Sequence, residues 1–189
     1  MVRLDKIYTR GGDSGQTGLS DGSRVSKTSP RIAAIGAVDE VNSALGVARL
    51  NAKGEFGAAL ARLQNDLFDL GADLSAPQED RKGEGALRIC DAQVERLERE
   101  IDAINEKLSP LTSFILPGGT ALAAHLHLAR AIARRAEATM VKLASHEKIN
   151  DAALRYANRL SDLLFVMARA ANDGGKSDVL WVPGGNRQS

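Results

Sequence analysis

Five segments of the chain place apolar residues three or four positions apart, the spacing that gathers them on one face of an α-helix. The first segment begins at Pro30, directly after Ser29, a pair typical of a helix N-terminus. The others run from about Phe56 to Leu74, from Val94 to a stop at Pro110, from Thr120 to about His146, and from about Asn150 to Asn172, before Gly174 and Gly175. No segment alternates apolar and polar residues convincingly. We therefore predict an all-α bundle of five helices.

The predicted helices divide the chain into three parts. Residues 1–29 form a glycine-rich arm, residues 30–173 the bundle and residues 174–189 a tail; 189 residues suit one domain. The stretch 77–85 is polar and contains glycine, which predicts a surface loop. Short apolar stretches at 115–116 and 179–182 fall in a connecting loop and in the tail.

Composition and charge narrow the classes of partner. Hydrophobic residues make up 43% of the chain, which favours a globular protein. Aromatic residues make up only 4%, and alanine and leucine dominate, which favours helices packed at close range. The formal net charge of +1 gives no global attraction to nucleic acid or membrane, so any anion site must be local. We find no secretory signal and no membrane-spanning apolar run, and expect a cytoplasmic protein. The single cysteine, Cys90, falls in a helical pattern and is expected to be a packed, unreactive thiol.

The glycine-rich stretch 7–18 carries the chemistry of a polyphosphate site. Its glycines let backbone N–H groups approach a ligand closely. Thr9, Ser14 and Thr17 add hydroxyl groups, and Arg10 adds a forked cation. The stretch is not a Walker A loop, because no Gly-Lys-Ser/Thr closes it. The alternative is a flexible, solvated N-terminal arm.

A second candidate is a polar stripe on the fourth predicted helix. Its members, three or four positions apart, are His127, Arg130, Arg134 and Glu137, with Arg135 beside them. Two arginines and a histidine are costly to bury unless they are paired or bound to an anion. The alternative is a solvated face with an Arg134–Glu137 ion pair, which contributes only about 0.2–0.5 kcal/mol.

Further polar residues lie on the first and last helices. Asn158 and Asp162 are four apart and share a face, either as phosphate or base contacts or as ordinary polar surface. Asp39 follows one turn after Ile35 and has no cationic partner at helical spacing within its own helix. No His-Glu-x-x-His or di-iron pattern occurs, so we expect no protein-ligated transition metal.

Several linked motifs resemble the PduO-type ATP:cob(I)alamin adenosyltransferases, in register over nearly the whole chain. The arm 8–15 resembles that family's ATP loop, and residues 36–42 resemble its first-helix signature. Residues 114–119 resemble its corrin-side loop, 130–137 its phosphate helix and 158–162 its last-helix signature. The resemblance implies a ferritin-like five-helix bundle that forms a homotrimer, with ATP and corrinoid bound where two subunits meet.

The resemblance also implies a reaction: transfer of the 5′-deoxyadenosyl group of ATP to the cobalt of cob(I)alamin, with release of triphosphate. Cob(I)alamin is a substrate, Mg²⁺ accompanies ATP, and a cob(II)alamin reductase is an expected partner. The alternative functions are those of a non-catalytic nucleotide-sensing bundle and of a purely structural helical oligomer.

Roles follow position by position from the same resemblance. The residues expected to bind ATP are Thr9, Arg10, Gly11, Gly12, Asp13, Gly15, Thr17, Gly18, Lys27, Arg134, Arg135, Glu137 and Asn158. Those expected in catalysis are Arg130, Arg134, Asp39 and Phe114, with Asp39 paired to Arg130 across the subunit interface. Phe114 and Asp162 are expected to contact the corrinoid, and Glu137 is a candidate magnesium ligand. The alternative for Phe114 is a buried anchor of its loop.

Overall fold

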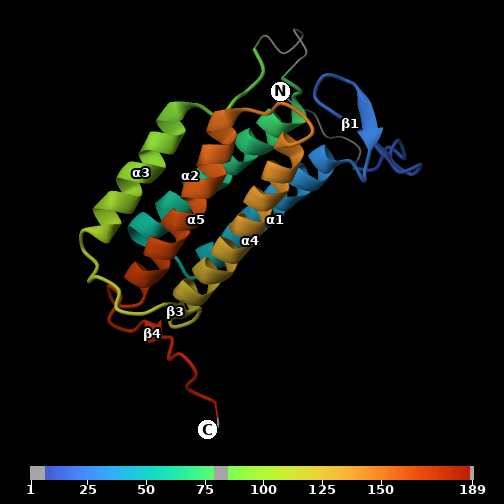
Figure 1. The fold of residues 1–189 in the computed structure, drawn as a ribbon. Helices are drawn as coiled ribbons and strands as arrows, with labels where there is room; N and C mark the ends of the chain where they lie inside the picture. Colours follow the sequence, from blue (N-terminus) through green and yellow to red (C-terminus); the bar gives the residue numbers. More distant parts are fainter. Residues whose placement is uncertain (1–6, 79–84, 188–189) are drawn as a thin grey trace.

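The computed structural model describes residues 7–78 and 85–187, and it confirms a bundle of five helices (Figure 1). The helices are α1 (Pro30–Arg49), α2 (Gly54–Ser75), α3 (Asp91–Asn105), α4 (Ala121–Ala144) and α5 (Asp151–Ala171). In the arrangement, α1 packs against α2 and α4, and α5 packs against α3 and α4. Most of the predicted loop at 77–85 lies outside the described residues.

Local sequence signals explain where three of the helices begin. Ser29 caps α1 by accepting a hydrogen bond from the Ile32 amide, with Pro30 as the first helical residue. Thr120 caps α4 and Asn150 caps α5 in the same way. The third helix ends at Asn105, earlier than the apolar pattern predicted, and turns lead on toward Pro110.

The core is filled by the apolar faces that the helical spacing predicted. Leu45 of α1, Leu63 of α2, Leu97 of α3, Met140 of α4 and Leu160 of α5 are all at most 1% exposed. Alanines at the α4 interface let its neighbours pack closely.

A hydrogen-bonded polar cluster around Tyr156 lies inside this core. The buried Tyr156 hydroxyl donates to the Asp66 carboxylate at 2.8 Å, and Arg96 forms an ion pair with the same carboxylate. Burial raises the pKa of Tyr156 well above its ordinary value, and the Asp66 charge raises it further. The hydroxyl therefore stays protonated and serves as a hydrogen-bond donor.

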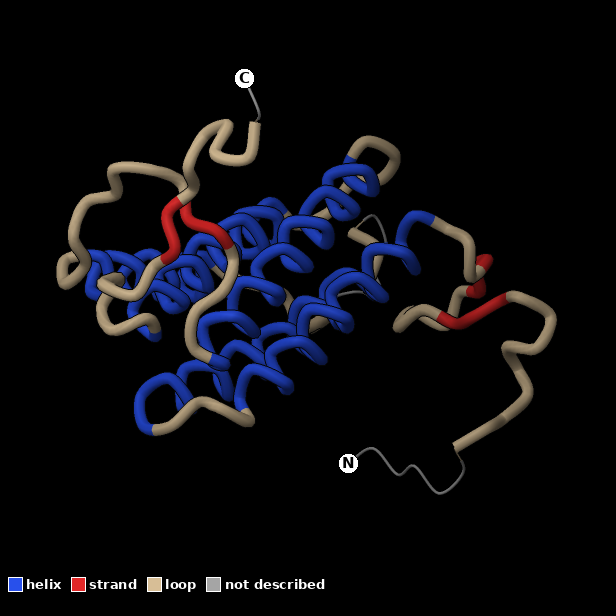
Figure 2. Tube along the Cα trace, turned by 90° about the horizontal axis from the view of Figure 1, so that it is seen from below, coloured by secondary structure: helices blue, strands red, loops and turns tan. Residues whose placement is uncertain are grey.

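The all-α prediction is confirmed, and two small antiparallel sheets accompany the five helices. In the first sheet β1 (Gln16–Gly18) pairs with β2 (Arg24–Ser26) in the arm. In the second, β3 (Ile115–Leu116) pairs with β4 (Val179–Leu180) of the tail. Strands of two or three residues are too short to show alternation. The sheets lie at opposite ends of the bundle (Figures 1 and 2).

The expectation that Cys90 is a packed thiol was wrong. Cys90 is exposed and forms the N-cap of α3, one position before the helix begins. The apolar spacing of α3 starts at Val94, so the pattern did not locate the boundary. The next-door residue Ile89 is the one that is buried.

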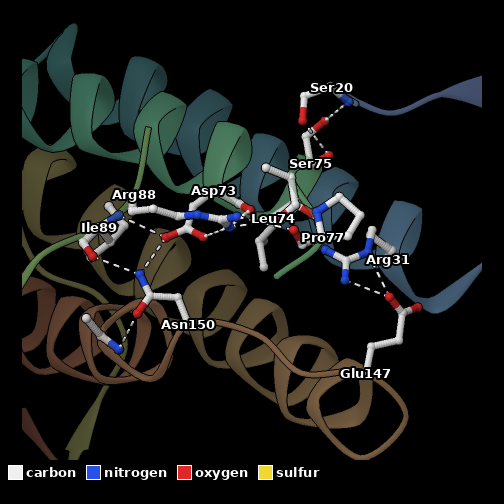
Figure 3. A network of polar contacts seen from close by, with 12 residues as sticks. Ser20, Arg31, Asp73, Leu74, Ser75, Pro77, Arg88, Ile89, Glu147 and Asn150 are labelled. Atoms are coloured by element: carbon white, nitrogen blue, oxygen red, sulfur yellow. Dashed lines mark hydrogen bonds and ion pairs between the residues drawn. The ribbon is translucent and has the colours of Figure 1, made fainter. Parts of the chain in front are cut away.

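A polar network joins the chain segments at the arm end of the bundle (Figure 3). Asp73 accepts from Arg88 at 2.7 Å and from Asn150 at 2.7 Å. The arm itself is attached through Ser20, whose hydroxyl donates to the Ser75 carbonyl at 2.8 Å and whose amide donates to the Ser75 hydroxyl at 3.1 Å. These bonds fix the arm hairpin against the C-terminal end of α2.

Arg31 extends this network to the α4–α5 connection. It is 3% exposed and donates to Glu147 and to the Leu74 carbonyl, which ties the start of α1 to the end of α2 (Figure 3).

Within the described part of the chain, no helix has the length and apolar character needed to cross a bilayer.

Candidate functional site

The arm folds into a defined hairpin. Arg10 has a positive φ of 60°, and its guanidinium lies 5.8 Å from the centre of the Tyr8 ring. Arg24 donates to the Gly11 carbonyl at 2.5 Å, which closes the turn. A Cβ atom at Gly12 would lie 2.9 Å from Lys27 Nζ, so the end of the Lys27 side chain lies close against the loop backbone at this glycine.

A groove of about 610 Å³ lies between this hairpin and helices α1 and α2. Thr17, Gly18 and Lys27 line its arm side, and Asp39 lines it from α1. Phe68 of α2 is 72% exposed and adds apolar surface. The groove thus combines a cation, a carboxylate and an apolar wall, the mixture expected of a small-molecule site.

On α4 the polar stripe is partly buried. His127 is 2% exposed, and neither of its ring nitrogens has a hydrogen-bond partner among the described residues. Nε of Arg130 is likewise buried and unpartnered there, and its guanidinium lies 6.0 Å from the centre of the Phe165 ring on α5. A buried donor left unsatisfied costs about 1–3 kcal/mol. The stripe is therefore not an ordinary solvated helix face.

Charge is concentrated along this stripe. Burial lowers the pKa of His127, the Arg130 cation lowers it further, and Asp178 opposes the change. Burial and the neighbouring Arg134 lower the pKa of Arg130. Arg134 is exposed, and no ion pair joins it to Glu137 in the described structure. The alternative of an intrahelical Arg134–Glu137 pair was therefore wrong.

The neighbours of the stripe bond across helices. Glu137 accepts from the Asn158 amide of α5 at 2.8 Å, which brings two of the predicted ATP-binding residues together. Arg135 forms an ion pair with Glu40 of α1, so its charge is shared with a carboxylate. Asp162, predicted to contact the corrinoid, lies exposed one turn after Asn158.

Phe114 lies in the loop between α3 and α4 at the other end of the bundle. Its side chain is 78% exposed, which contradicts the alternative of a buried loop anchor. The ring lies 6.0 Å from that of Trp181, with an angle of 53° between the planes. A hollow of about 700 Å³ adjoins this pair and is lined by Trp181, Leu116 and the tail at 182–187.

The predicted site residues thus form separate groups within one chain. Thr17, Gly18, Lys27 and Asp39 meet at the groove, whereas Glu137 and Asn158 meet between α4 and α5. No described contact joins Asp39 to Arg130 in the same chain: Asp39 faces the α1–α2 groove and Arg130 lies over Phe165.

Sequence reasoning missed Phe165 and Trp181. Phe165 is one of many apolar residues on α5, so only the tertiary contact with Arg130 distinguishes it. Trp181 did carry a signal, because it is the only tryptophan of the chain and lies in an apolar tail segment.

The metal chemistry of the site is limited. In residues 7–78 and 85–187, no group of three or more His, Cys, Asp or Glu side chains is placed to hold a metal ion. Glu137 offers a single carboxylate. That suits Mg²⁺ carried largely by phosphate oxygens, because this ion is usually bound through one or two carboxylates together with substrate phosphates.

Comparison with known proteins gives a consistent result. The family model described as cobalamin adenosyltransferase matches residues 7–171. A corrinoid adenosyltransferase of Mycobacterium leprae is 49% identical over 97% of this chain and 99% of its own length. A cobalamin adenosyltransferase of Cupriavidus metallidurans is also 49% identical, over 95% of each chain.

A solved structure has the same fold. A variant PduO-type ATP:corrinoid adenosyltransferase from Lactobacillus reuteri, complexed with cobalamin and ATP, superposes with a TM-score of 0.86. It is 39% identical, and the match covers 93% of this chain and 99% of that one. The motifs, the five-helix bundle and these matches agree, and the chain belongs to the cobalamin adenosyltransferase family.

Proposed function

We propose that this protein transfers the 5′-deoxyadenosyl group of ATP to the cobalt of cob(I)alamin, giving adenosylcobalamin and triphosphate. The observation that carries the proposal is the α4 stripe, where Arg130 and Arg134 have no carboxylate partner in the described structure. Cations held without a counter-charge favour a polyanionic ligand. Relatives with this fold are named corrinoid adenosyltransferases.

The chemistry needs no nucleophilic side chain. Cobalt(I) supplies an electron pair to C5′ of ATP, the Co–C bond forms as the C5′–O bond breaks, and the pair from that bond leaves with triphosphate. The substrate carries the difficult step, and the protein orients the reactants and stabilises the leaving charge.

The residues proposed for the leaving group are Arg134 and Lys27, with the amides of the arm glycines. Each charge-assisted hydrogen bond to the triphosphate contributes about 1.5–3 kcal/mol. Glu137 and Asn158, already 2.8 Å apart, hold the nucleotide or its Mg²⁺. Arg135 serves this role only if it leaves Glu40 or shares its guanidinium between Glu40 and phosphate.

The site is proposed to form between subunits of a homotrimer. The arm and the Phe114 loop lie at opposite ends of the bundle (Figures 1 and 2), and the 24 residues of α4 span about 36 Å. One chain cannot bring its own arm and its own Phe114 loop to one reacting centre. Asp39 and Arg130 are both unpaired within the described chain and would pair between copies.

Phe114 and Asp162 are proposed to contact the corrinoid. An exposed aromatic ring beside a hollow can lie flat on the lower face of the corrin and exclude an axial ligand. Removing an axial ligand makes the metal easier to reduce, by the same influence that ligands exert on haem. Cob(I) has to be supplied by reduction of cob(II), so a reductase and a reducing cytoplasm complete the proposal.

The test is direct. The protein is incubated with Mg-ATP and chemically reduced cobalamin, and the visible spectrum is followed for adenosylcobalamin. Formation of product at a rate that depends on protein and ATP supports the proposal. Binding of ATP, seen as a rise in melting temperature, without transfer would favour the nucleotide-sensing bundle. Absence of both would favour a structural oligomer.

A further inference from the structure

Trp181 of the tail is joined directly to Phe114. Its backbone N–H donates to the Phe114 carbonyl at 2.7 Å, and the Ser113 hydroxyl donates to the Trp181 carbonyl at 2.8 Å. The two aromatic rings lie 6.0 Å apart at a tilt of 53°, within the range of favourable aromatic pairs. Backbone pairing and ring contact therefore link the same two positions.

The loop and the tail are both fixed at their bases by a buried polar centre at the end of α5. Arg169 donates to the Asp178 carboxylate at 2.9 Å and to the Ser109 carbonyl at 2.9 Å. Asn172 donates to the same carboxylate at 3.1 Å and to the Gly118 carbonyl at 3.2 Å. These bonds hold the base of each segment that carries one of the two exposed aromatic rings.

We propose that Trp181 is a positioning residue for adenosyl transfer: it holds the Phe114 ring in the orientation that shields the lower face of the corrin. The inference rests on the proposed function and extends it to a residue with no chemical role of its own. An unsupported ring at 78% exposure would sample several rotamers. A tilted partner ring favours one orientation about two- to tenfold.

The first measurement needs no substrate. Trp181 is the only tryptophan, so tryptophan fluorescence, excited selectively over the two tyrosines, reports on this position alone. Replacing Phe114→Ala should shift the emission and increase quenching by acrylamide. The matched control is Leu111→Ala, which removes a 41%-exposed apolar side chain from the same loop and should leave the emission unchanged.

The second measurement follows the cobalt. With cob(II)alamin and Mg-ATP bound, electron paramagnetic resonance gives the fraction of cobalt that lacks an axial ligand. Trp181→Ala should lower that fraction, and kcat from cob(II)alamin, about two- to tenfold, with the KM for ATP and the melting temperature unchanged. Trp181→Phe should restore both, because it keeps the ring. In a Phe114→Ala background, Trp181→Ala should cause no further loss.

The inference would be overturned by additive losses in the double variant, by an equal loss in Leu111→Ala, or by an unshifted emission in Phe114→Ala. A wild-type protein that forms no adenosylcobalamin overturns the proposed function. A wild-type protein that forms it, with Trp181→Ala equally active from cob(II)alamin, overturns only the role of Trp181.

Discussion

Among single residues, the arginines differ in what they contact. Arg31, Arg96 and Arg169 each meet a carboxylate and hold the bundle together. In the described structure, Arg134 meets none, and it is exposed on α4. An arginine without a partner in the fold is available for a ligand. Its replacement should therefore change turnover without changing the stability of the protein.

We expect Arg134→Ala to lower kcat on the order of 10²-fold, because one preorganised contact to the leaving triphosphate is lost. The melting temperature should stay near that of the wild type. Arg134→Lys should recover only part of the rate, since lysine lacks the planar fork.

Steady-state kinetics and thermal unfolding of both variants test this. Arg99→Ala is the matched control, because Arg99 is an exposed helical arginine whose only described ion pair is with Glu95, one turn earlier on α3. Near-normal turnover in Arg134→Ala would remove Arg134 from the mechanism.

The buried imidazole of His127 gives a prediction for stability against pH. Its folded pKa lies below the ordinary value of 6.5, because burial and Arg130 disfavour the charged form while Asp178 only partly opposes them. The unfolded chain therefore binds more protons than the folded chain below about pH 6.5, and the free energy of unfolding should fall as the pH drops through that value.

Urea unfolding at several pH values above and below this point measures the effect. His127→Phe keeps an aromatic ring against Phe165 without a titratable group, so its stability should change less with pH over the same interval. An identical pH dependence in the two proteins would show that His127 does not contribute.

At the scale of elements, the arm hairpin is held to the helices by few contacts. Apart from its own hydrogen bonds, its described hydrogen bonds to the helices are those between Ser20 and Ser75. Ordering each backbone residue costs about 1–2 kcal/mol, and the exposed residues of the arm bury little apolar surface to offset it.

We expect the amides of Gly11–Gly18 to exchange with solvent rapidly in the free protein and to become protected on addition of Mg-ATP. Hydrogen-exchange mass spectrometry measures this, with the amides of α5 as the internal control. Protection that does not change on adding Mg-ATP would contradict closure of the arm over the nucleotide.

The whole molecule raises the question of assembly. The arm hairpin and the Phe114 loop lie at opposite ends of the bundle (Figures 1 and 2), and Asp39 and Arg130 face different neighbours. A site built from both groups therefore requires more than one copy. The proposed homotrimer would supply this, and activity would then depend on the interface.

The charge-swap double variant Asp39→Arg with Arg130→Asp should recover more assembly and turnover than either single change, if the two residues pair directly. Sedimentation velocity and the transfer assay give the two readouts. A wild-type monomer at micromolar concentration with full activity would refute an intersubunit site.

The sequence alone determined the helices, because burial of an apolar face every three to four residues is a local pattern and caps such as Ser29 mark its ends. Linked motifs also identified the family. Sequence did not reveal the β3–β4 pairing or the Phe114–Trp181 pair, since these depend on contacts between segments far apart in the chain. The exposed Cys90 was missed because the apolar spacing of α3 did not locate the start of the helix. Which charges are paired was likewise decided by tertiary structure: helix packing joins Arg135 to Glu40 and leaves Arg134 free among the described residues.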